Sequence, residues 1–358
     1  MSGPVRGKFG MASTMKAAVK SKPAPKSTEI RTVPIPSPGP TEVLIRVKVA
    51  SICGTDVHIY DWDAWAQARI KVPLVQGHEF SGYVEKVGSD VKGLKRGDYV
   101  SAEGHVADGT CYMCRTGNAH VCKSVSIIGI DRDGAFAEYL KVPASSVIVN
   151  DPDLPPELAT MQDPLGNAVY TTTNANVPGK TVAIFGLGPI GLMAVAVCRA
   201  MGAGRVLAIG HRNEYRMKLA KTVGAHAVLK SDKGLVDEVM DLTSGEGVDE
   251  VLEFSGSEQV LAQALSIVRP AGGIHILGLY AKPVTFDLSE MVTKGVSMYG
   301  IHGRLMYKTW YQMGGLLRSG NLNLRPILTH KFPLDKYAEA MDVMRSGDCG
   351  KVAFPMEG

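Results

Sequence analysis

Hydrophobic and polar residues alternate in short runs from about residue 15 to about residue 149. The segments 42–50 and 80–88 are examples, in which aliphatic and aromatic residues are interleaved with polar ones. Pro and Gly recur between such runs, a combination that is typical of short strands joined by turns. The pattern predicts an antiparallel, barrel-like β domain.

Near residue 180 the pattern changes to apolar runs of strand length that alternate with helical stretches. Continuous apolar runs are typical of parallel strands covered on both faces. Their alternation with helices, here over 214–223 and 261–268, predicts a doubly wound α/β sheet. Beyond residue 303, two helical patterns flank an extended stretch over 328–332. The apolar runs cover residues 181–185, 205–209, 248–254 and 273–277.

These patterns divide the 358 residues into two domains, a number that the length also suggests. Residues 1–14 carry Gly, Ser, Lys and Arg without the apolar core of a signal peptide, and we expect a disordered leader there. A β-rich catalytic domain is expected over 15–164 and a dinucleotide-binding domain over 165–303. Residues 304–358 are expected to return to the first domain.

Charge and cysteine usage exclude several classes of protein. The formal net charge is +4 and no dense stripe of Lys and Arg occurs, which argues against nucleic-acid and membrane-surface binding. The apolar run over 190–198 is too short to span a bilayer. Six cysteines, three of them in one loop, do not resemble a disulfide framework. We therefore expect a reducing compartment.

Four potential zinc ligands lie in that loop: Asp108, Cys111, Cys114 and Cys122. They are separated by two, two and seven residues, which is close enough to complete a tetrahedral site without distant chain. A site with four protein ligands leaves no position for a substrate, so this metal is expected to be structural. The alternative is a disulfide with one spare thiol.

A Gly-x-Gly-x-x-Gly motif, formed by Gly186, Gly188 and Gly191, follows an apolar strand and opens an apolar helix. In this context the glycines permit a tight turn, close approach of the backbone to a pyrophosphate, and close helix–strand packing. The helix N-terminus offers free N–H groups and a positive dipole end to the phosphates. The motif predicts a dinucleotide site; a glycine-rich turn without a ligand is the alternative.

The end of the next strand indicates which dinucleotide binds. An NAD site normally presents Asp or Glu there to the ribose 2′-hydroxyl. Here the strand ends in Gly210, His211 and Arg212, without an acid. Arg212 with His211 beside it forms a pocket for an anion, so the sequence favours NADP over NAD. Alternatively, Glu214 turns inward to the ribose and Arg212 is a solvated cation.

A second set of metal ligands consists of Cys53, which follows a strand, and the adjacent His78 and Glu79. Thiolate, imidazole and carboxylate form a zinc set that keeps one position open for a substrate oxygen. A metal held in this way is a Lewis acid that stabilises the alkoxide from which hydride leaves. Taken singly, Cys53 is equally well a buried apolar cysteine and His78 a core histidine.

The segment 77–79, the cysteine loop and the glycine motif together resemble the zinc-dependent medium-chain dehydrogenases/reductases. Residues 53–65 are similar, more narrowly, to the L-threonine 3-dehydrogenases of that family. The resemblance spans about residues 15–354, and it implies a GroES-like catalytic domain, a Rossmann domain and a homotetrameric cytoplasmic enzyme. Further segments that carry it are 103–105, 163–169, 213–216 and 303–311.

The resemblance also implies roles for matching residues. The three ligands above would hold the catalytic zinc, and Asp163 would lie near it and tune coordination or proton movement. Thr55 and His58 match a pair that relays a proton from the alkoxide to solvent, which suits a hydroxyl and a group that titrates near neutral pH. A structural role beside aromatic residues is the alternative for His58. The implied cofactor contacts are Ile190, Arg216, Leu277, Gly278, Leu279, Ile301 and His302.

Two positions depart from the family pattern. Asp108 stands where the structural loop usually has a fourth cysteine, and His211 replaces the strand-end acid of a usually NAD-dependent family. The implied activity is oxidation of the 3-hydroxyl of L-threonine to 2-amino-3-oxobutanoate, with Trp62, Trp65 and His105 shaping the pocket. The alternatives are an NADP-dependent sugar, polyol or secondary-alcohol dehydrogenase on the same scaffold, and a catalytically silent nucleotide-binding scaffold.

Overall fold

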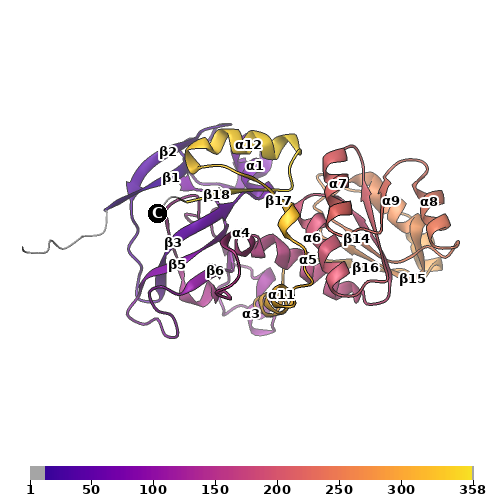
Figure 1. Cartoon of the computed structure of the whole chain (residues 1–358), viewed down its shortest axis with the longest axis horizontal. Helices are drawn as coiled ribbons and strands as arrows, with labels where there is room; N and C mark the ends of the chain where they lie inside the picture. The colour runs from indigo at the N-terminus through magenta and orange to yellow at the C-terminus, as the bar shows by residue number, and fades with distance from the viewer. Residues whose placement is uncertain (1–12, 357–358) are drawn as a thin grey trace, which may run out of the picture.

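The computed structural model describes residues 13–356, which fold into two lobes side by side along the long axis of the molecule (Figure 1). A β-rich lobe contains both ends of the described chain, and a parallel-sheet lobe contains its middle. α5 (Gln162–Ala175) and α11 (Lys308–Arg318) lie between them. Most of the predicted leader lies outside the described residues. Its predicted end is wrong, because Thr14 already pairs with Pro34 in an antiparallel ladder.

The β-rich lobe is built on a seven-stranded sheet. Its central strands β3 (Glu42–Ser51) and β5 (Glu79–Val87) pair antiparallel, which confirms the two strands predicted in this region. The last strand, β18 (Lys351–Pro355), pairs antiparallel with β3, so the chain returns to this lobe at its C-terminal end. The domain boundaries themselves stay predictions. The other strands of this sheet are β6 (Tyr99–Ala102), β9 (Tyr139–Pro143), β10 (Val147–Val149) and β17 (Leu328–Lys331).

Smaller elements surround that sheet. A three-stranded sheet in the order β2-β1-β4 packs beside it, and the pair β7-β8 leads toward the cysteine loop. The strands are β1 (Thr14–Lys20), β2 (Thr28–Pro34), β4 (Leu74–Val75), β7 (His105–Val106) and β8 (Ser126–Ile127), and the helices of this lobe are α1 (Gly54–Asp61), α2 (Ala64–Arg69), α3 (Tyr112–Arg115), α4 (Pro156–Ala159) and α12 (Tyr337–Ser346).

The second lobe has a six-stranded sheet in the order β13-β12-β11-β14-β15-β16, with all neighbouring pairs parallel. This confirms the predicted doubly wound fold. The order reverses between β11 (Thr181–Phe185) and β14 (Val248–Glu253), where such sheets form a ligand crevice. The remaining elements are β12 (Arg205–Gly210), β13 (Ala227–Lys230), β15 (Val268–Ile276), β16 (Ser297–Gly300), α6 (Pro189–Ala200), α7 (Glu214–Thr222), α8 (Leu235–Leu242), α9 (Glu258–Ile267) and α10 (Leu288–Thr293).

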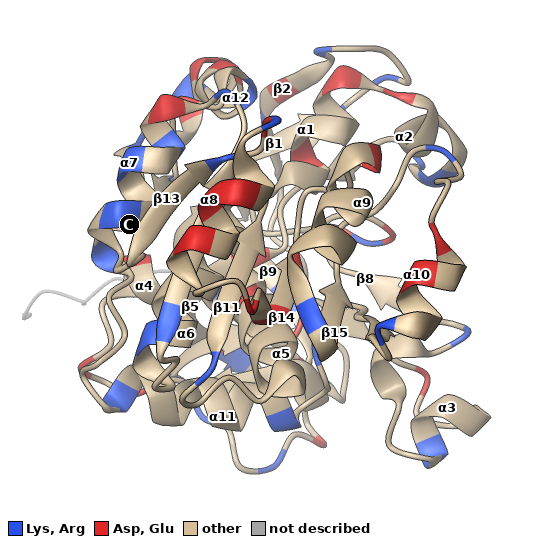
Figure 2. Cartoon of the chain, turned by 90° about the vertical axis from the view of Figure 1, so that its right-hand side faces the viewer, with Lys and Arg blue, Asp and Glu red and all other residues tan. Residues whose placement is uncertain are grey.

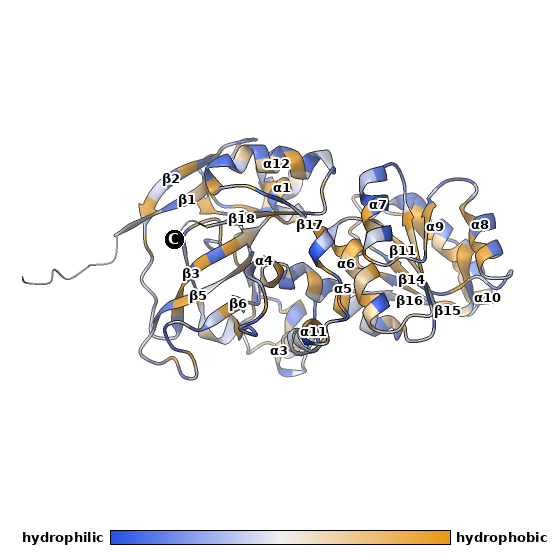
Figure 3. Cartoon of the chain, in the orientation of Figure 1, coloured by the Kyte–Doolittle hydropathy of each residue, from blue (hydrophilic) through white to orange (hydrophobic). Residues whose placement is uncertain are grey.

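Burial explains why the strands of this sheet read as unbroken apolar runs. Val182, Ala183 and Ile184 of β11 are all fully buried, but they belong to two different cores. Val182 and Ile184 pack into the core that contains α6, while Ala183 packs into the core that contains α8 and α9. Successive residues of a strand point to opposite faces, and here helices cover both. Figure 3 shows the apolar strands inside and polar residues on the outer helices.

Charged residues are distributed over the surface rather than gathered by sign. Figure 2 shows Lys and Arg interspersed with Asp and Glu on the face of the parallel-sheet lobe. This agrees with the small net charge of +4. Within residues 13–356, no helix has the length and apolar character that crossing a membrane requires.

Candidate active site

A cavity of about 1000 Å³ opens at the carboxyl ends of β11 and β12, beside the point where the strand order reverses. Gly186 and Gly188 line it, and Gly188 is the N-cap of α6, so the first turn of that helix begins at the cavity. Gly186 has a φ of +85°, and a Cβ on Gly191 would lie 1.9 Å from the Gly186 carbonyl oxygen. Side chains at these two positions would push the helix off the strand, which explains the glycines.

The strand-end residues Gly210, His211 and Arg212 line one end of the same cavity. The loop after β13 adds Ser231, Asp232 and Lys233 there, and the sequence analysis missed this contribution. Nothing in the sequence pattern marks Lys233, because it is an ordinary loop lysine until the parallel pairing of β12 and β13 brings it to His211. The cavity therefore has cationic side chains from two separate loops.

Glu214, the alternative ribose ligand, points elsewhere. Its carboxylate pairs with Lys230 at 2.9 Å and its side chain is 62% exposed. Arg216 does line the cavity, and its Nε also donates to the carbonyl oxygen of Cys349 at 3.0 Å. That bond ties α7 to the β-rich lobe.

The other predicted cofactor contacts lie outside this cavity. Leu277 and Gly278 donate their backbone N–H groups to the carbonyl oxygen of Glu253, at the carboxyl end of β14. Leu279 follows and is 90% exposed. Gly191 of the glycine motif is likewise not among the residues that line it, nor are the remaining contacts expected from the resemblance, Ile190, Ile301 and His302. Their cofactor roles stay predictions.

The predicted catalytic ligands come together at the junction of the lobes. Ligand atoms of Cys53, His78 and Glu79 all lie within 4.8 Å of one another. Cys53 is the N-cap of α1 and its backbone N–H donates to Asp56 Oδ2 at 2.9 Å, which fixes the start of that helix. His78 and Glu79 lie at the start of β5, and both are buried.

The charges around His78 fit a bound cation. Burial alone would lower the pKa of His78, but the neighbouring Cys53 thiolate and the carboxylates of Asp56 and Asp163 raise it to about 10. Nδ1 of the buried His78 ring has no hydrogen-bond partner among the described residues. An imidazole among so many anions, with a thiol as its nearest partner, is a donor set suited to zinc.

Two side chains of the β-rich lobe hold the Glu79 carboxylate. Lys351 Nζ lies 2.6 Å from Glu79 Oε1, the Ser51 hydroxyl donates to Oε2, and all three residues are buried. The sequence analysis missed Lys351, which enters from the last strand, 272 residues after Glu79. Asp56, close to His78 and Glu79, is fully buried, and this burial raises the pKa of its carboxyl to about 6.

The two predicted relay residues lie on α1. Thr55 Oγ1 is 3.7 Å from Cys53 Sγ, and His58 is one turn further along with 59% of its side chain exposed. Nδ1 of His58 is 2.6 Å from Asp63, the N-cap of α2, a partner that the sequence analysis missed. The Trp65 ring stands edge-on to His58 at 6.1 Å. The predicted pair therefore runs from the metal group to solvent.

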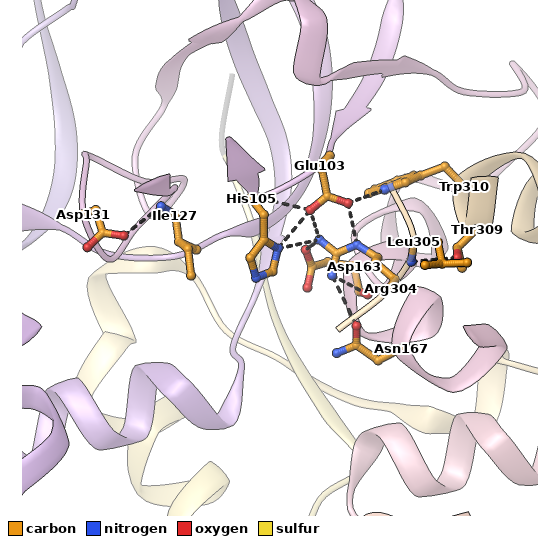
Figure 4. A network of polar contacts seen from close by, with 10 residues as sticks. All are labelled: Glu103, His105, Ile127, Asp131, Asp163, Asn167, Arg304, Leu305, Thr309 and Trp310. Carbon is orange, nitrogen blue, oxygen red and sulfur yellow. Dashed lines mark hydrogen bonds and ion pairs between the residues drawn. The ribbon is translucent and has the colours of Figure 1, made fainter. Parts of the chain in front are cut away.

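A buried polar network is centred on Glu103 and Arg304 (Figure 4). Glu103 accepts hydrogen bonds from the backbone and Nδ1 of His105, both at 2.9 Å, and from Trp310 Nε1 at 2.7 Å. Burial alone would raise the pKa of Glu103, but the charge of Arg304 and these hydrogen bonds lower it to about 2. Arg304 also donates to Asp163, which thereby lies close to His78 but outside the metal group.

The four residues of the cysteine loop also form one group, with ligand atoms within 4.8 Å of one another. Cys111 Sγ lies 3.6 Å from Cys114 Sγ and 3.9 Å from Cys122 Sγ. Tetrahedral zinc with Zn–S bonds of about 2.3 Å requires S···S separations of about 3.8 Å. All six cysteines are free thiols, so the alternative of a disulfide in this loop is wrong. Asp108 Oδ1 accepts from the N–H groups of Thr110 and Cys111, which leaves Oδ2 for a metal.

Comparison with known families agrees with this geometry. The family model "Alcohol dehydrogenase GroES-like domain" matches residues 39–153, and "Zinc-binding dehydrogenase" matches residues 189–319. The L-threonine 3-dehydrogenase of Pyrococcus abyssi is 49% identical over 97% of this chain and 100% of its own length. The L-threonine 3-dehydrogenase of Bacillus subtilis is 50% identical over 94% of this chain and 97% of its own.

Solved structures of dehydrogenases share the fold over nearly the whole chain. An alcohol dehydrogenase from Thermus sp. ATN1 has a TM-score of 0.88 and 31% identity, covering 96% of this chain and 100% of its own. A putative zinc-binding dehydrogenase from Sinorhizobium meliloti, bound to NADP, has a TM-score of 0.86 and 27% identity over the same shares. Both lobes and their arrangement are thus those of known dehydrogenases.

Proposed function

The chain belongs to the zinc-dependent medium-chain dehydrogenases, and from that premise we propose that it oxidises the 3-hydroxyl of L-threonine to 2-amino-3-oxobutanoate, with hydride transfer to NAD(P). The observation that carries the proposal is similarity to L-threonine 3-dehydrogenases at about half identity over nearly the full length. The ligand group between the lobes supports it, because the chemistry needs a Lewis acid beside a dinucleotide crevice.

Zinc fits both ligand groups, and we assign one catalytic and one structural ion to each chain. Cys53, His78 and Glu79 would hold the first, and the cysteine loop with Asp108 the second. Zinc bound in the first group supplies the Lewis acidity that makes an alcohol a stronger acid. Lys351 pairs with the Glu79 carboxylate and holds it in place. The Cys53 thiolate and the His78 imidazole would be the other two protein ligands.

The residues of α1 then remove the proton that the alcohol loses. The Thr55 hydroxyl, beside Cys53, accepts it and passes it toward the imidazole of His58. His58 is exposed and its Nδ1 is fixed by Asp63, so the ring keeps one nitrogen for exchange with water. Trp62 and Trp65 shape the pocket wall beside this relay, and His105 the wall on the opposite side.

NADP is the proposed cofactor. A ribose 2′-phosphate requires cations where an NAD site has an acid, and Arg212, His211 and Lys233 surround that end of the cavity. Glu214, which the sequence analysis named as the alternative ribose ligand, is paired with Lys230. The NADP-bound structure from Sinorhizobium meliloti demonstrates that this fold accommodates the phosphate.

We also propose a homotetramer in the cytoplasm. β16 forms an edge of the parallel sheet, and its Tyr299 is exposed by 43%. On α10, the helix that precedes this strand, Leu288 is exposed by 65% and Val292 by 73%. Tyr112, exposed by 71% on the cysteine loop, supplies a second apolar surface, as a tetramer with two kinds of interface requires. Free thiols throughout fit a reducing compartment. Light scattering after gel filtration measures the mass.

Initial rates test the activity. Zinc-loaded protein is assayed on L-threonine, D-threonine, secondary alcohols and polyols, with NAD and NADP side by side. We expect turnover on L-threonine, with the higher kcat/KM for NADP. Turnover confined to polyols or sugars would instead identify the alternative enzyme on the same scaffold, and inertness of the fully loaded protein would identify a silent one.

A further inference from the structure

Arg304 is a fully buried cation that joins the two lobes. It is 2% exposed and follows β16 of the parallel-sheet lobe after only three residues. Its guanidinium Nε and Nη2 donate to the two oxygens of Glu103, in the β-rich lobe, at 2.8 and 2.6 Å. A bidentate pair of this kind fixes the plane of the guanidinium as well as its distance.

The rest of the guanidinium reaches α5. Nη2 also donates to Oδ1 of Asp163, and Nη1 donates to the Asp163 carbonyl oxygen and to Asn167 Oδ1, each at 3.3 Å. Figure 4 shows the Arg304 head between Glu103 and Asp163. Nη2 therefore joins the two carboxylates, and the guanidinium that Glu103 anchors determines where the Asp163 carboxylate lies.

Packing restricts the conformation of the Arg304 side chain. A Cβ on Gly166 of α5 would lie 2.4 Å from Arg304 Cδ, so the helix backbone touches the stem. On the other side the Trp310 ring lies 5.6 Å from the guanidinium carbon. A side chain confined in this way transmits a displacement at its base to the groups at its tip.

Asp163 is close to the metal ligands without being one of them. A Cβ added to Gly104 would lie 3.3 Å from Asp163 Oδ1 and 3.7 Å from His78 Cβ, so both side chains border the same glycine. Asp163 is nevertheless absent from the group formed by Cys53, His78 and Glu79. The bond from Arg304 would keep Asp163 from ligating a divalent cation bound there, because a carboxylate so close to the ion would otherwise be attracted to it.

The base of Arg304 lies next to predicted cofactor contacts. Ile301 donates its N–H to the Ile276 carbonyl oxygen at 2.8 Å, which extends the ladder of β15 into this loop, and His302 follows. We propose that Arg304 is a positioning residue that holds the Asp163 carboxylate beside the metal without ligating it, and that links this carboxylate to the cofactor loop. This inference rests on the proposed function only for the identity of the cofactor and metal.

The test uses Arg304→Lys in the full-length protein. Lys keeps the positive charge but lacks the planar guanidinium with its several N–H donors, so it can no longer hold Glu103 and Asp163 together. Cobalt replaces zinc in the catalytic group, and the visible d–d absorption is recorded without substrate. Cofactor affinity is measured by fluorescence, also without substrate, so both readouts stay informative if L-threonine is not the substrate. The matched control is Lys180→Met, which breaks the 2.7 Å Lys180–Glu250 ion pair inside the parallel-sheet lobe.

In Arg304→Lys we expect the cobalt absorption to lose intensity, as it does when an oxygen ligand raises the coordination number. The cofactor Kd should rise about tenfold, the effect of one weakened charged contact. On the substrate that the enzyme turns over, kcat should fall by about tenfold to a hundredfold, the scale for a displaced catalytic group, with less change in KM. The control should lose stability only.

A lowered melting temperature with wild-type cobalt spectrum, cofactor affinity and kcat would show a purely structural role and overturn the proposal. Should Arg304→Lys not fold, Gly166→Ala replaces it, because the added methyl group displaces the Arg304 stem without changing any charge. The same spectral and affinity changes are expected there. Their absence in folded Gly166→Ala would overturn the proposal equally.

Discussion

Replacement of Glu103 by Gln should remove a defined part of the dependence of stability on pH. The Glu103 carboxyl is fully buried and accepts bonds from Arg304, His105 and Trp310, which together lower its pKa from 4.5 to about 2. A depressed pKa contributes stability above the unfolded value of 4.5, and that stability is lost as the pH falls toward 2. The difference of about 2.5 pKa units corresponds to about 3 kcal/mol.

Integration of the linkage relation shows how much is lost at accessible pH. Between pH 6 and pH 3, the free energy of unfolding of the wild-type protein should lose about 2 of these 3 kcal/mol, and Glu103→Gln should not show this loss. Urea unfolding of both proteins at pH 6, 5, 4 and 3 gives the free energy of unfolding at each pH. The stability gap between them should therefore narrow by about 2 kcal/mol.

Subtraction of the two curves removes the other groups that titrate in this range, including the metal ligands, because both proteins contain them. Gln keeps the shape of the side chain and one acceptor oxygen, so the network loses its charge and not its packing. A gap that stays constant from pH 6 to pH 3 would refute the reasoning, since it would mean that Glu103 has the same pKa in the folded and unfolded chain.

Three further predictions concern the cofactor and the metals. Arg212→Ala should weaken NADP binding by about 1 to 3 kcal/mol, the cost of a lost charged hydrogen bond, and leave NAD almost unchanged in fluorescence titrations; equal losses would contradict a 2′-phosphate role. Gly191→Ala should abolish binding of both cofactors, because its Cβ would lie 1.9 Å from the Gly186 carbonyl oxygen, and an unchanged Kd would contradict this. Cys111→Ser should reduce the bound zinc measured by mass spectrometry from two ions per chain to one; retention of both ions would exclude a structural site in that loop.

The parts of the fold that local chemistry determines could be predicted from the sequence. The strand β11 is recognisable because helices cover both of its faces, which demands apolar residues at every position. The glycine motif and the cysteine loop are equally local, because each set of partners lies within a few residues. Cys53, His78 and Glu79 required the combination of two segments, which the chemistry of their donor atoms suggested and the resemblance supported.

Residues that act through distant partners could not be found in this way. Lys351 contacts Glu79 across 272 residues and Arg304 contacts Glu103 across 201 residues, and neither has a local signature of burial. A lysine or arginine is normally exposed, so its burial follows only from the carboxylate that the fold places opposite. Lys233 is a similar case, because the pairing of β12 with β13 brings its loop to the cofactor cavity.

Transfer of a deuterium label tests the central claim most directly, namely that C3 of L-threonine donates hydride to a nicotinamide in the crevice while its hydroxyl gives up a proton. L-Threonine labelled with deuterium at C3 is incubated with NADP and the zinc-loaded protein, and the reduced cofactor is examined by NMR. We predict deuterium at C4 of the nicotinamide, with transfer abolished by chelation and restored by zinc. Reduced cofactor without the label, or label transfer that persists in metal-free protein, would contradict the account.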